Sequence, residues 1–270
     1  FVLSDKVQNR VTEFLDTKTI AVELQRQGYK TAMMGKYLNN YEVMIPYIPP
    51  GWDLFLNVEK GEGEKWFDYD YVKGSSTPSS SSTGQVIHST EYNTYFMRDE
   101  AIKFIDENAN KPFFLYWATR APHGPATAAP EDLDKFLDYN YDVPSRHETD
   151  LSDKPEYVRN KKYEDEDDEK DEDDEEFPVK QLQSLQAVDR SIQDLIDKLA
   201  EEKILNKTVI IFAGDNGYMW GEHGLWKKGQ PYEESIHVPL IIRMPTVQKG
   251  STDEIVGMNI DIPATVFWLA

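Results

Sequence analysis

An alternation of helical segments with short, continuous apolar runs constrains the fold more than any other feature of the chain. Apolar residues at helical spacing predict three helices, at residues 17–27, 92–108 and 179–203. Continuous apolar runs predict strands covered on both faces, at residues 113–118, 207–213 and 239–243. A shorter strand is predicted at 30–35, short strands or a hairpin within 53–72, and a short helix at 131–137. Helices that alternate with such strands predict an α/β fold with three layers, α/β/α, around a mainly parallel central sheet.

The composition excludes several classes of protein. With 270 residues the chain is long enough for one large domain, and it contains no cysteine, so disulfides and thiolate chemistry are excluded. Its apolar runs are far shorter than the ~18 residues of a transmembrane helix. The formal net charge of −20 argues against general nucleic-acid binding, because phosphate contacts need clustered Lys and Arg, and the sequence has no such cluster.

Two segments stand apart from the predicted core. Residues 75–83 are rich in serine and predict a loop. Residues 164–176 contain twelve acidic residues and one lysine, which predicts a disordered, solvated insertion, although a tract of this kind can also bind Ca²⁺ or a basic partner. The chain starts at Phe1 without an initiator Met and stops just after Pro263 begins a predicted helix. We therefore expect residues 1–270 to be one incomplete domain of a longer protein.

Ligands of parallel sheets bind beyond the carboxyl ends of the strands, which selects Lys36, His123 and the pair Asp215-Asn216. A carboxylate beside a carboxamide offers hard oxygen ligands for Ca²⁺ or Mg²⁺, but two are too few, and for the pair taken alone an Asx turn is the better interpretation. His123, between two prolines, suits anion binding or proton donation, or is a surface residue of a proline turn. A lysine at a strand end binds an anion or simply reaches solvent.

A second glycine-rich segment also contains basic residues. Residues 221–229 contain His223, Lys227 and Lys228 between glycines, which indicates a loop of defined shape, although a solvated basic pair is the simpler interpretation. Asn206-Lys207-Thr208 fits the N-glycosylation pattern, and also a plain turn between a helix and a strand, which we favour.

Taken together, the segments resemble the sulfatase family of the alkaline-phosphatase-like superfamily. The matching motifs come in the family's order and span most of residues 17–270: Gly28-Tyr-Lys-Thr-Ala, Gly35-Lys36-Tyr-Leu-Asn39, Pro49-Pro-Gly-Trp-Asp53, Ala121-Pro-His123-Gly-Pro125, Asp215-Asn216-Gly217, Gly221-Glu-His223-Gly-Leu-Trp226, Lys228-Gly, Tyr232-Glu-Glu-Ser and Asn259-Ile-Asp-Ile-Pro-Ala-Thr265. The earlier motifs look most like glucosamine-6-sulfatases and heparan endosulfatases, and the segment from Gly221 looks more like microbial polysaccharide sulfatases.

The resemblance implies hydrolysis of sulfate esters on sugars or polysaccharides, outside the cytoplasm. The family uses Ca²⁺ and a formylglycine that is made from Cys or Ser in a Cys/Ser-x-Pro-x-Arg motif. The roles that the resemblance implies are as follows: Lys36 and Lys228 bind the sulfate, His123 gives a proton to the leaving oxygen, Asn39 and His223 contact the substrate, and Asp215 and Asn216 bind Ca²⁺.

The chain departs from the family in its nucleophile. It has no cysteine and no Ser-x-Pro-x-Arg, and Asp142-Val-Pro-Ser-Arg146 has an aspartate at the first position, which cannot become formylglycine. We expect the nucleophile and the remaining Ca²⁺ ligands upstream of Phe1, so that this chain alone is inactive and binds Ca²⁺ poorly. Asn39 stands near where many members have a histidine. Two alternatives stay open: a phosphodiesterase or phosphonate hydrolase of the same superfamily, and an inactive protein that binds sulfated glycans.

Overall fold

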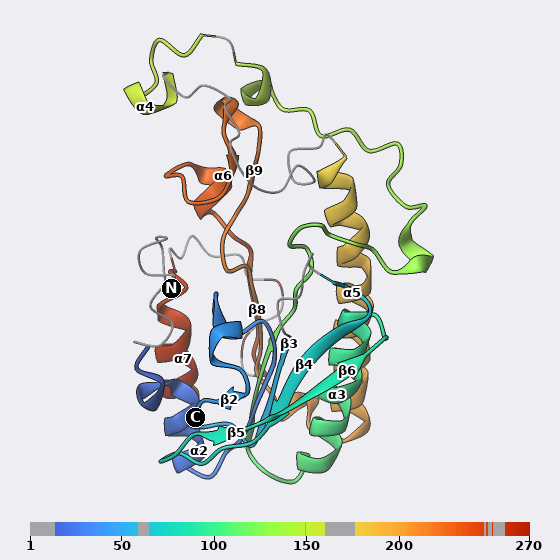
Figure 1. The fold of residues 1–270 in the computed structure, drawn as a ribbon, viewed down its shortest axis with the longest axis vertical. Helices are drawn as coiled ribbons and strands as arrows, with labels where there is room; N and C mark the ends of the chain where they lie inside the picture. Colours follow the sequence, from blue (N-terminus) through green and yellow to red (C-terminus); the bar gives the residue numbers. More distant parts are fainter. Residues whose placement is uncertain are drawn as a thin grey trace. The chain divides into compact units, whose positions relative to one another are not determined.

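The computed structural model describes residues 14–58, 65–148, 150–159, 176–245, 247, 250 and 257–270 (Figure 1). The chain divides into two compact units, which are described separately. The first contains residues 1–121, 187–208 and 244–270, and the second contains residues 122–186 and 209–243. The predicted acidic insertion, 164–176, lies outside the described residues except for Glu176.

A five-stranded sheet is the centre of the first unit. Its strands are β1 (Lys30–Gly35), β3 (Leu54–Val58), β4 (Tyr69–Gly74), β6 (Gln85–Ser89) and β7 (Phe113–Ala118), in the order β6-β4-β3-β1-β7. Strand β1 pairs in parallel with both β3 and β7, whereas β4 pairs antiparallel with β3 and β6. The predicted strand at 30–35 and the predicted hairpin within 53–72 are therefore confirmed.

Helices cover both faces of this sheet (Figure 1). Helix α2 (Ile20–Arg26) packs on one face, where its Ala21 joins a core with Met33 of β1 and Phe55 of β3. Helix α3 (Asn93–Asn108) packs on the other, where Phe104 joins Ala32 of β1. The last part of α5 (Phe177–Glu201) adds a side chain to that second core. These layers confirm the predicted α/β class and the three predicted helices.

The start of β1 is held by a buried turn around Asp53. The carboxylate of Asp53 accepts hydrogen bonds from the Thr31 amide (3.1 Å), the Lys30 ammonium (2.6 Å) and the Gln25 side-chain amide (3.1 Å). Burial raises the pKa of Asp53, but these hydrogen bonds outweigh burial and lower the pKa below its ordinary value. One side chain thus connects α2, β1 and the start of β3.

Shorter elements complete the first unit. They are the 3₁₀ turns η2 (Asp16–Lys18), η3 (Tyr41–Met44) and η6 (Leu205–Lys207), the strand pair β2 (Tyr47–Ile48) and β5 (Ser82–Thr83), and helix α7 (Asp261–Leu269). The turn η6 is the plain turn favoured at Asn206. The Ser-rich segment 75–83 is a loop that ends in β5, and Ser76 in it donates a 2.6 Å hydrogen bond to the Pro49 carbonyl. No helix among the described residues is long and apolar enough to cross a membrane.

The second unit is made of short elements around the first turns of α5. They are η4 (Pro130–Asp132), η5 (Pro144–His147), α4 (Glu156–Arg159), β8 (Ile210–Ala213), β9 (Met219–Trp220), η7 (Glu222–Gly224), β10 (Trp226–Lys227), α6 (Glu233–Ile236) and β11 (Leu240–Arg243). Strands β8 and β11 form an antiparallel pair, and so do β9 and β10. The helix predicted at 131–137 is only the 3₁₀ turn η4, followed by further turns.

The segment 113–118 was expected to be covered on both faces, and its side chains do pack into both cores: Phe113, Leu115 and Trp117 into one, Phe114 and Ala118 into the other. Only Tyr116 departs from this, being 47% exposed, and β7 is the edge of its sheet in the described residues. Two other strand predictions need correction. The segments 207–213 and 239–243 were also expected to be buried strands, yet they form the separate pair β8 and β11, where Ile241 is 62% exposed. Apolar content alone predicts a strand, but it does not determine the pairing partner or the direction of pairing.

Candidate active site

Lys36 follows β1 at the carboxyl end of the sheet, as the sequence predicts. Gly35 has a φ of +108°, and a Cβ there would lie 1.8 Å from the Ala118 carbonyl oxygen, so only glycine lets β1 end so close to β7. The Lys36 amide then donates a 3.0 Å hydrogen bond to the same carbonyl. The next amide, of Tyr37, donates to the side-chain oxygen of Asn57 at 3.0 Å. The backbone that carries Lys36 is therefore fixed on both sides.

Asn39, the other predicted site residue of the first unit, is exposed, as Lys36 is. It precedes a residue in the left-handed backbone region, Asn40, with a φ of 59°. Asparagine tolerates this conformation better than most residues. The segment after β1 therefore turns at once, which leaves Lys36 and Asn39 on the same short connection.

Asp215 and Asn216 follow β8 and are exposed. The Asn216 amide donates a 2.8 Å hydrogen bond to Asp215 Oδ1, and the Asn216 side-chain amide donates a 2.7 Å hydrogen bond to the Gly217 carbonyl. In an Asx turn the Asp side chain accepts from the amide two residues on, whereas here it accepts from the amide of the next residue. A carboxylate and a carboxamide oxygen suit Ca²⁺, which takes roughly 6–8 oxygen ligands, so these two would be only part of its shell. Within the described residues, no three His, Cys, Asp or Glu side chains are grouped so as to hold a metal ion.

Ser235, buried in α6, connects the segment after Asp215 to the segment that contains Lys228. Its carbonyl accepts a 2.9 Å hydrogen bond from the Gly217 amide, and its hydroxyl accepts one from the Gly229 amide at 3.0 Å. A Cβ on Gly217 would lie 2.0 Å from the Glu234 carbonyl oxygen, so the two segments touch closely. Ser235 thus holds both the segment after Asp215 and the segment that carries the exposed Lys228, which directly precedes Gly229.

His123 is partly buried on the loop after β7, and its Nδ1 lies 3.1 Å from the Gly124 carbonyl oxygen. Gln181 of α5 holds this loop: its side-chain amide donates to the Pro122 carbonyl at 3.1 Å, and its side-chain oxygen accepts from Trp220 Nε1 at 2.7 Å. Gln181 was not predicted from the sequence. Gln181 connects the His123 loop to Trp220, the last residue of β9, which lies three residues before His223 in the sequence.

His223 has a carboxylate partner and an aromatic partner. Its Nδ1 donates to Glu148 Oε2 at 2.7 Å, and its ring stacks on Tyr232 with 4.8 Å between centroids. Lys154 donates to the other oxygen of Glu148 at 2.9 Å. The hydrogen bonds from His223 and Lys154 lower the pKa of the Glu148 carboxyl, so Glu148 remains ionised and orients the imidazole.

The loop that carries His223 is built on a buried carboxylate, Glu222. It accepts hydrogen bonds from the Tyr141 hydroxyl and, at 2.6 Å, from the Trp220 amide. The backbone here uses left-handed conformations at Gly221 and at His223, with φ values of 104° and 54°. The sequence-based interpretation of 221–229 as a loop of defined shape is therefore confirmed.

The predicted site residues are divided between the two units. Five belong to the second unit, namely His123, Asp215, Asn216, His223 and Lys228, and two belong to the first, namely Lys36 and Asn39. Four residues that support them were missed from the sequence: Gln181, Ser235, Glu148 and Glu222. Glu222 and Ser235 lie within the motifs that begin at Gly221 and Tyr232 but were given no role, whereas Gln181 and Glu148 act through long-range side-chain hydrogen bonds that no local pattern reveals.

Lys36, His123 and the pair Asp215-Asn216 each follow a strand, which defines the class as an α/β protein with polar side chains beyond its strand ends. The comparison with known families narrows this class. The sequence model of the sulfatase family matches residues 5–270, and the chain belongs to the sulfatase family.

Individual relatives agree with the family assignment. The chain is 31% identical over 252 residues to the N-acetylglucosamine-6-sulfatase of Homo sapiens, a match that covers 90% of this chain and 44% of that protein. It is 29% identical over 265 residues to the extracellular sulfatase SULF-1 homolog of Drosophila melanogaster, which covers 93% of this chain and 22% of that protein. The chain therefore spans less than half the length of these relatives.

A solved structure supports the fold. The chain superimposes with a TM-score of 0.71 and 23% identity on a protein whose structure was determined in complex with its substrate D-glucosamine-2-N,6-O-disulfate. The match covers 93% of this chain and 60% of that protein. At this identity the likeness establishes the shared fold, which is the alkaline-phosphatase-like α/β fold predicted from the sequence.

Proposed function

We propose that this chain is part of a sulfuric ester hydrolase that acts on sulfated sugars or polysaccharides. The observation that carries the proposal is the sulfatase family match over residues 5–270. Relatives named as N-acetylglucosamine-6-sulfatases and extracellular sulfatases support a sulfated sugar as the substrate. Because the chain spans only part of those relatives, the proposal concerns the longer protein to which it belongs.

In this proposal, Lys36 and Lys228 bind the sulfate oxygens as two cations. A sulfate ester builds negative charge on its leaving oxygen during cleavage, so a cation or a proton donor near that oxygen lowers the barrier. His123 has the role of the donor to the leaving oxygen, on a loop that Gln181 fixes. Asn39 and His223 contact the sugar, and Glu148 orients His223.

Asp215 and Asn216 are proposed as two of the Ca²⁺ ligands, because a carboxylate and an amide oxygen are the donors that this ion prefers. Bound Ca²⁺ would neutralise negative charge on the sulfate. The nucleophile is proposed to be a formylglycine in another part of the longer protein, since the present chain has neither cysteine nor a Ser-x-Pro-x-Arg motif. We also propose that the protein works outside the cytoplasm, as relatives named extracellular do.

The test is release of sulfate from a 6-O-sulfated glucosamine substrate by the full-length protein in the presence of Ca²⁺. Lys36→Met and His123→Asn should each lower kcat by about 100-fold or more, because each removes charge stabilisation or proton donation in the transition state. Lys111→Met is the matched control: it removes an exposed lysine that has no proposed role, and should leave kcat unchanged. Full activity in Lys36→Met or in His123→Asn would contradict the proposed roles.

A phosphonate hydrolase remains the second candidate, because one solved neighbour is a phosphonate monoester hydrolase, with a TM-score of 0.54 and 22% identity over 66% of this chain. The same assay with a phosphonate monoester discriminates the two: a sulfatase should turn over the sulfate ester faster. Binding of sulfated sugars without turnover of either ester would instead identify an inactive glycan-binding protein.

A further inference from the structure

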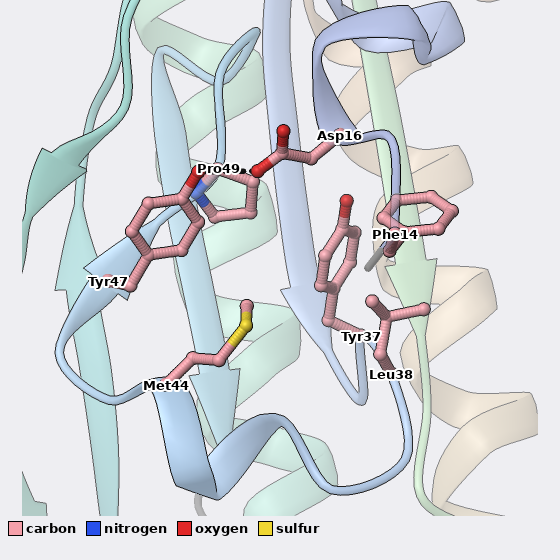
Figure 2. A pocket seen from close by; sticks show the side chains of 7 residues that line it. All are labelled: Phe14, Asp16, Tyr37, Leu38, Met44, Tyr47 and Pro49. Atoms are coloured by element: carbon pink, nitrogen blue, oxygen red, sulfur yellow. Dashed lines mark hydrogen bonds between the residues drawn. The ribbon is translucent and has the colours of Figure 1, made fainter. Parts of the chain in front are cut away.

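A pocket of about 400 Å³ lies in the first unit, outside the residues assigned to sulfate chemistry (Figure 2). Its volume falls in the range of ~300–1,000 Å³ that is usual for small-molecule sites. Among the described residues, the lining combines aromatic, aliphatic and acidic side chains without a basic one: Phe14, Asp16, Tyr37, Leu38, Met44, Tyr47 and Pro49.

The polar groups of the pocket are one carboxylate and two phenols. The Tyr47 hydroxyl donates a hydrogen bond to Asp16, which leaves the carboxylate with further acceptor positions (Figure 2). Burial, together with the negative charge of Asp16, raises the pKa of Tyr37, and burial with the Asp16 hydrogen bond raises the pKa of Tyr47. Both phenols therefore stay neutral at physiological pH, and Asp16 carries the single negative charge of the described lining residues.

The walls of the pocket are held in place by the fold. The Tyr37 ring packs edge-on against Tyr41 and Phe55, with centroids 5.7 and 5.3 Å away. Tyr47 belongs to β2, whose backbone pairs with β5, and the Tyr41 hydroxyl donates to the Tyr47 carbonyl. A pocket with fixed walls loses little conformational entropy when a ligand binds.

We propose that this pocket binds an amine-bearing sugar ring, with the ammonium group against Asp16. A carboxylate with spare acceptor positions recognises an ammonium, and the neutral phenols exchange hydrogen bonds with ring hydroxyls. The apolar C–H face of the ring packs on the aromatic and aliphatic walls. The single negative charge disfavours ligands that carry sulfate or carboxylate at this position. This inference goes beyond the proposed hydrolysis and does not depend on it.

The first experiment measures binding to the full-length protein by isothermal titration, with glucosamine, glucose and glucosamine N-sulfate as probes. Glucosamine should bind about tenfold more tightly than glucose, the size expected for one charge-assisted hydrogen bond in a partly buried site, and the N-sulfate should bind most weakly. Equal binding of glucosamine and glucose, tighter binding of the N-sulfate, or no binding of glucosamine would overturn the proposal.

Variants locate the binding in this pocket. Asp16→Asn keeps the shape and removes the charge, so it should weaken glucosamine binding about tenfold while glucose binding changes little. Tyr47→Phe should weaken both probes by less, because it removes only a hydroxyl. Glu42→Gln, in the neighbouring turn η3 but outside the lining, is the matched control and should bind like the parent protein.

Unchanged glucosamine binding in both Asp16→Asn and Tyr47→Phe would place the binding elsewhere and refute the assignment. The probes carry no 6-O-sulfate and no turnover is measured, so failure here leaves the proposed sulfatase activity standing. Absence of sulfate release with intact glucosamine binding would refute the proposed sulfatase activity and leave the proposed sugar pocket standing.

Discussion

Substitution of Asp53 by alanine should destabilise the first unit by about 1–4 kcal/mol. The substitution removes the acceptor of the Thr31 amide, and a buried unsatisfied donor costs about 1–3 kcal/mol. Loss of the half-exposed ion pair with Lys30 adds about 1 kcal/mol or less. The Gln25 side-chain amide and the Thr31 hydroxyl each keep a second partner, a backbone carbonyl, so they add little.

Asp53→Asn separates the two contributions. Asparagine keeps an acceptor for the Thr31 amide and loses the ion pair, so it should cost only about 1 kcal/mol. The measurement is equilibrium unfolding in urea, followed by circular dichroism and by tryptophan fluorescence. If alanine and asparagine cost the same, or if alanine costs less than about 1 kcal/mol, the account of this hydrogen-bond network is refuted.

The same variant predicts a pH dependence. The pKa of Asp53 is lower in the folded protein than in the unfolded chain, so its stabilising effect is present above the unfolded pKa and disappears as the pH falls through the folded pKa. The stability difference between the parent protein and Asp53→Asn should therefore be constant near neutral pH and shrink below about pH 4. A difference that grows toward low pH would contradict the assigned direction.

Two further predictions concern β1 and the sheet edge. Gly35→Ala should lower the free energy of unfolding by about 2–5 kcal/mol, because it adds positive-φ strain and overlap with the Ala118 carbonyl. Gly28→Ala, also at positive φ but with nothing within 4 Å, should lower it by only about 1–2 kcal/mol. Equal losses in thermal or urea unfolding would contradict the steric argument. The ring nitrogens of His88 hydrogen-bond Asp70 at 2.8 Å and Asp68 at 3.0 Å, which raises the pKa of His88 in the folded protein. The parent protein should therefore be more stable than His88→Asn below about pH 6.5, and this difference should disappear as the pH rises through the folded pKa. A pH-independent difference would refute this.

Much of the first unit could be predicted because its signals are local. Thr19 caps α2, the apolar stripe of α3 faces the sheet, and Gly35 ends β1 where the sequence places Lys36. The parallel pairing of β1 with β7 also follows from an intervening helix, since parallel strands need a long crossover. Local composition and short-range geometry agree in this unit.

The second unit was predicted less well because its structure depends on long-range contacts. The apolar runs of β8 and β11 predicted strands correctly but gave no information on their antiparallel pairing or their exposure. Gln181 meets the Pro122 carbonyl 59 residues away and Trp220 39 residues away, so nothing near it in the sequence marks its role. The motif around Asp215 was visible, whereas its connection to Gly229 through Ser235 was not.

The central claim, that this chain belongs to a working sulfatase, is tested most directly by peptide mass mapping of the full-length native protein. The account predicts a Cys/Ser-x-Pro-x-Arg motif outside the 270 residues described by this sequence, with the mass of formylglycine at its first position. A full-length protein that contains no such motif, or one whose first position is neither Cys, Ser nor formylglycine, would contradict catalysis and leave a sulfatase-like fold that binds glycans.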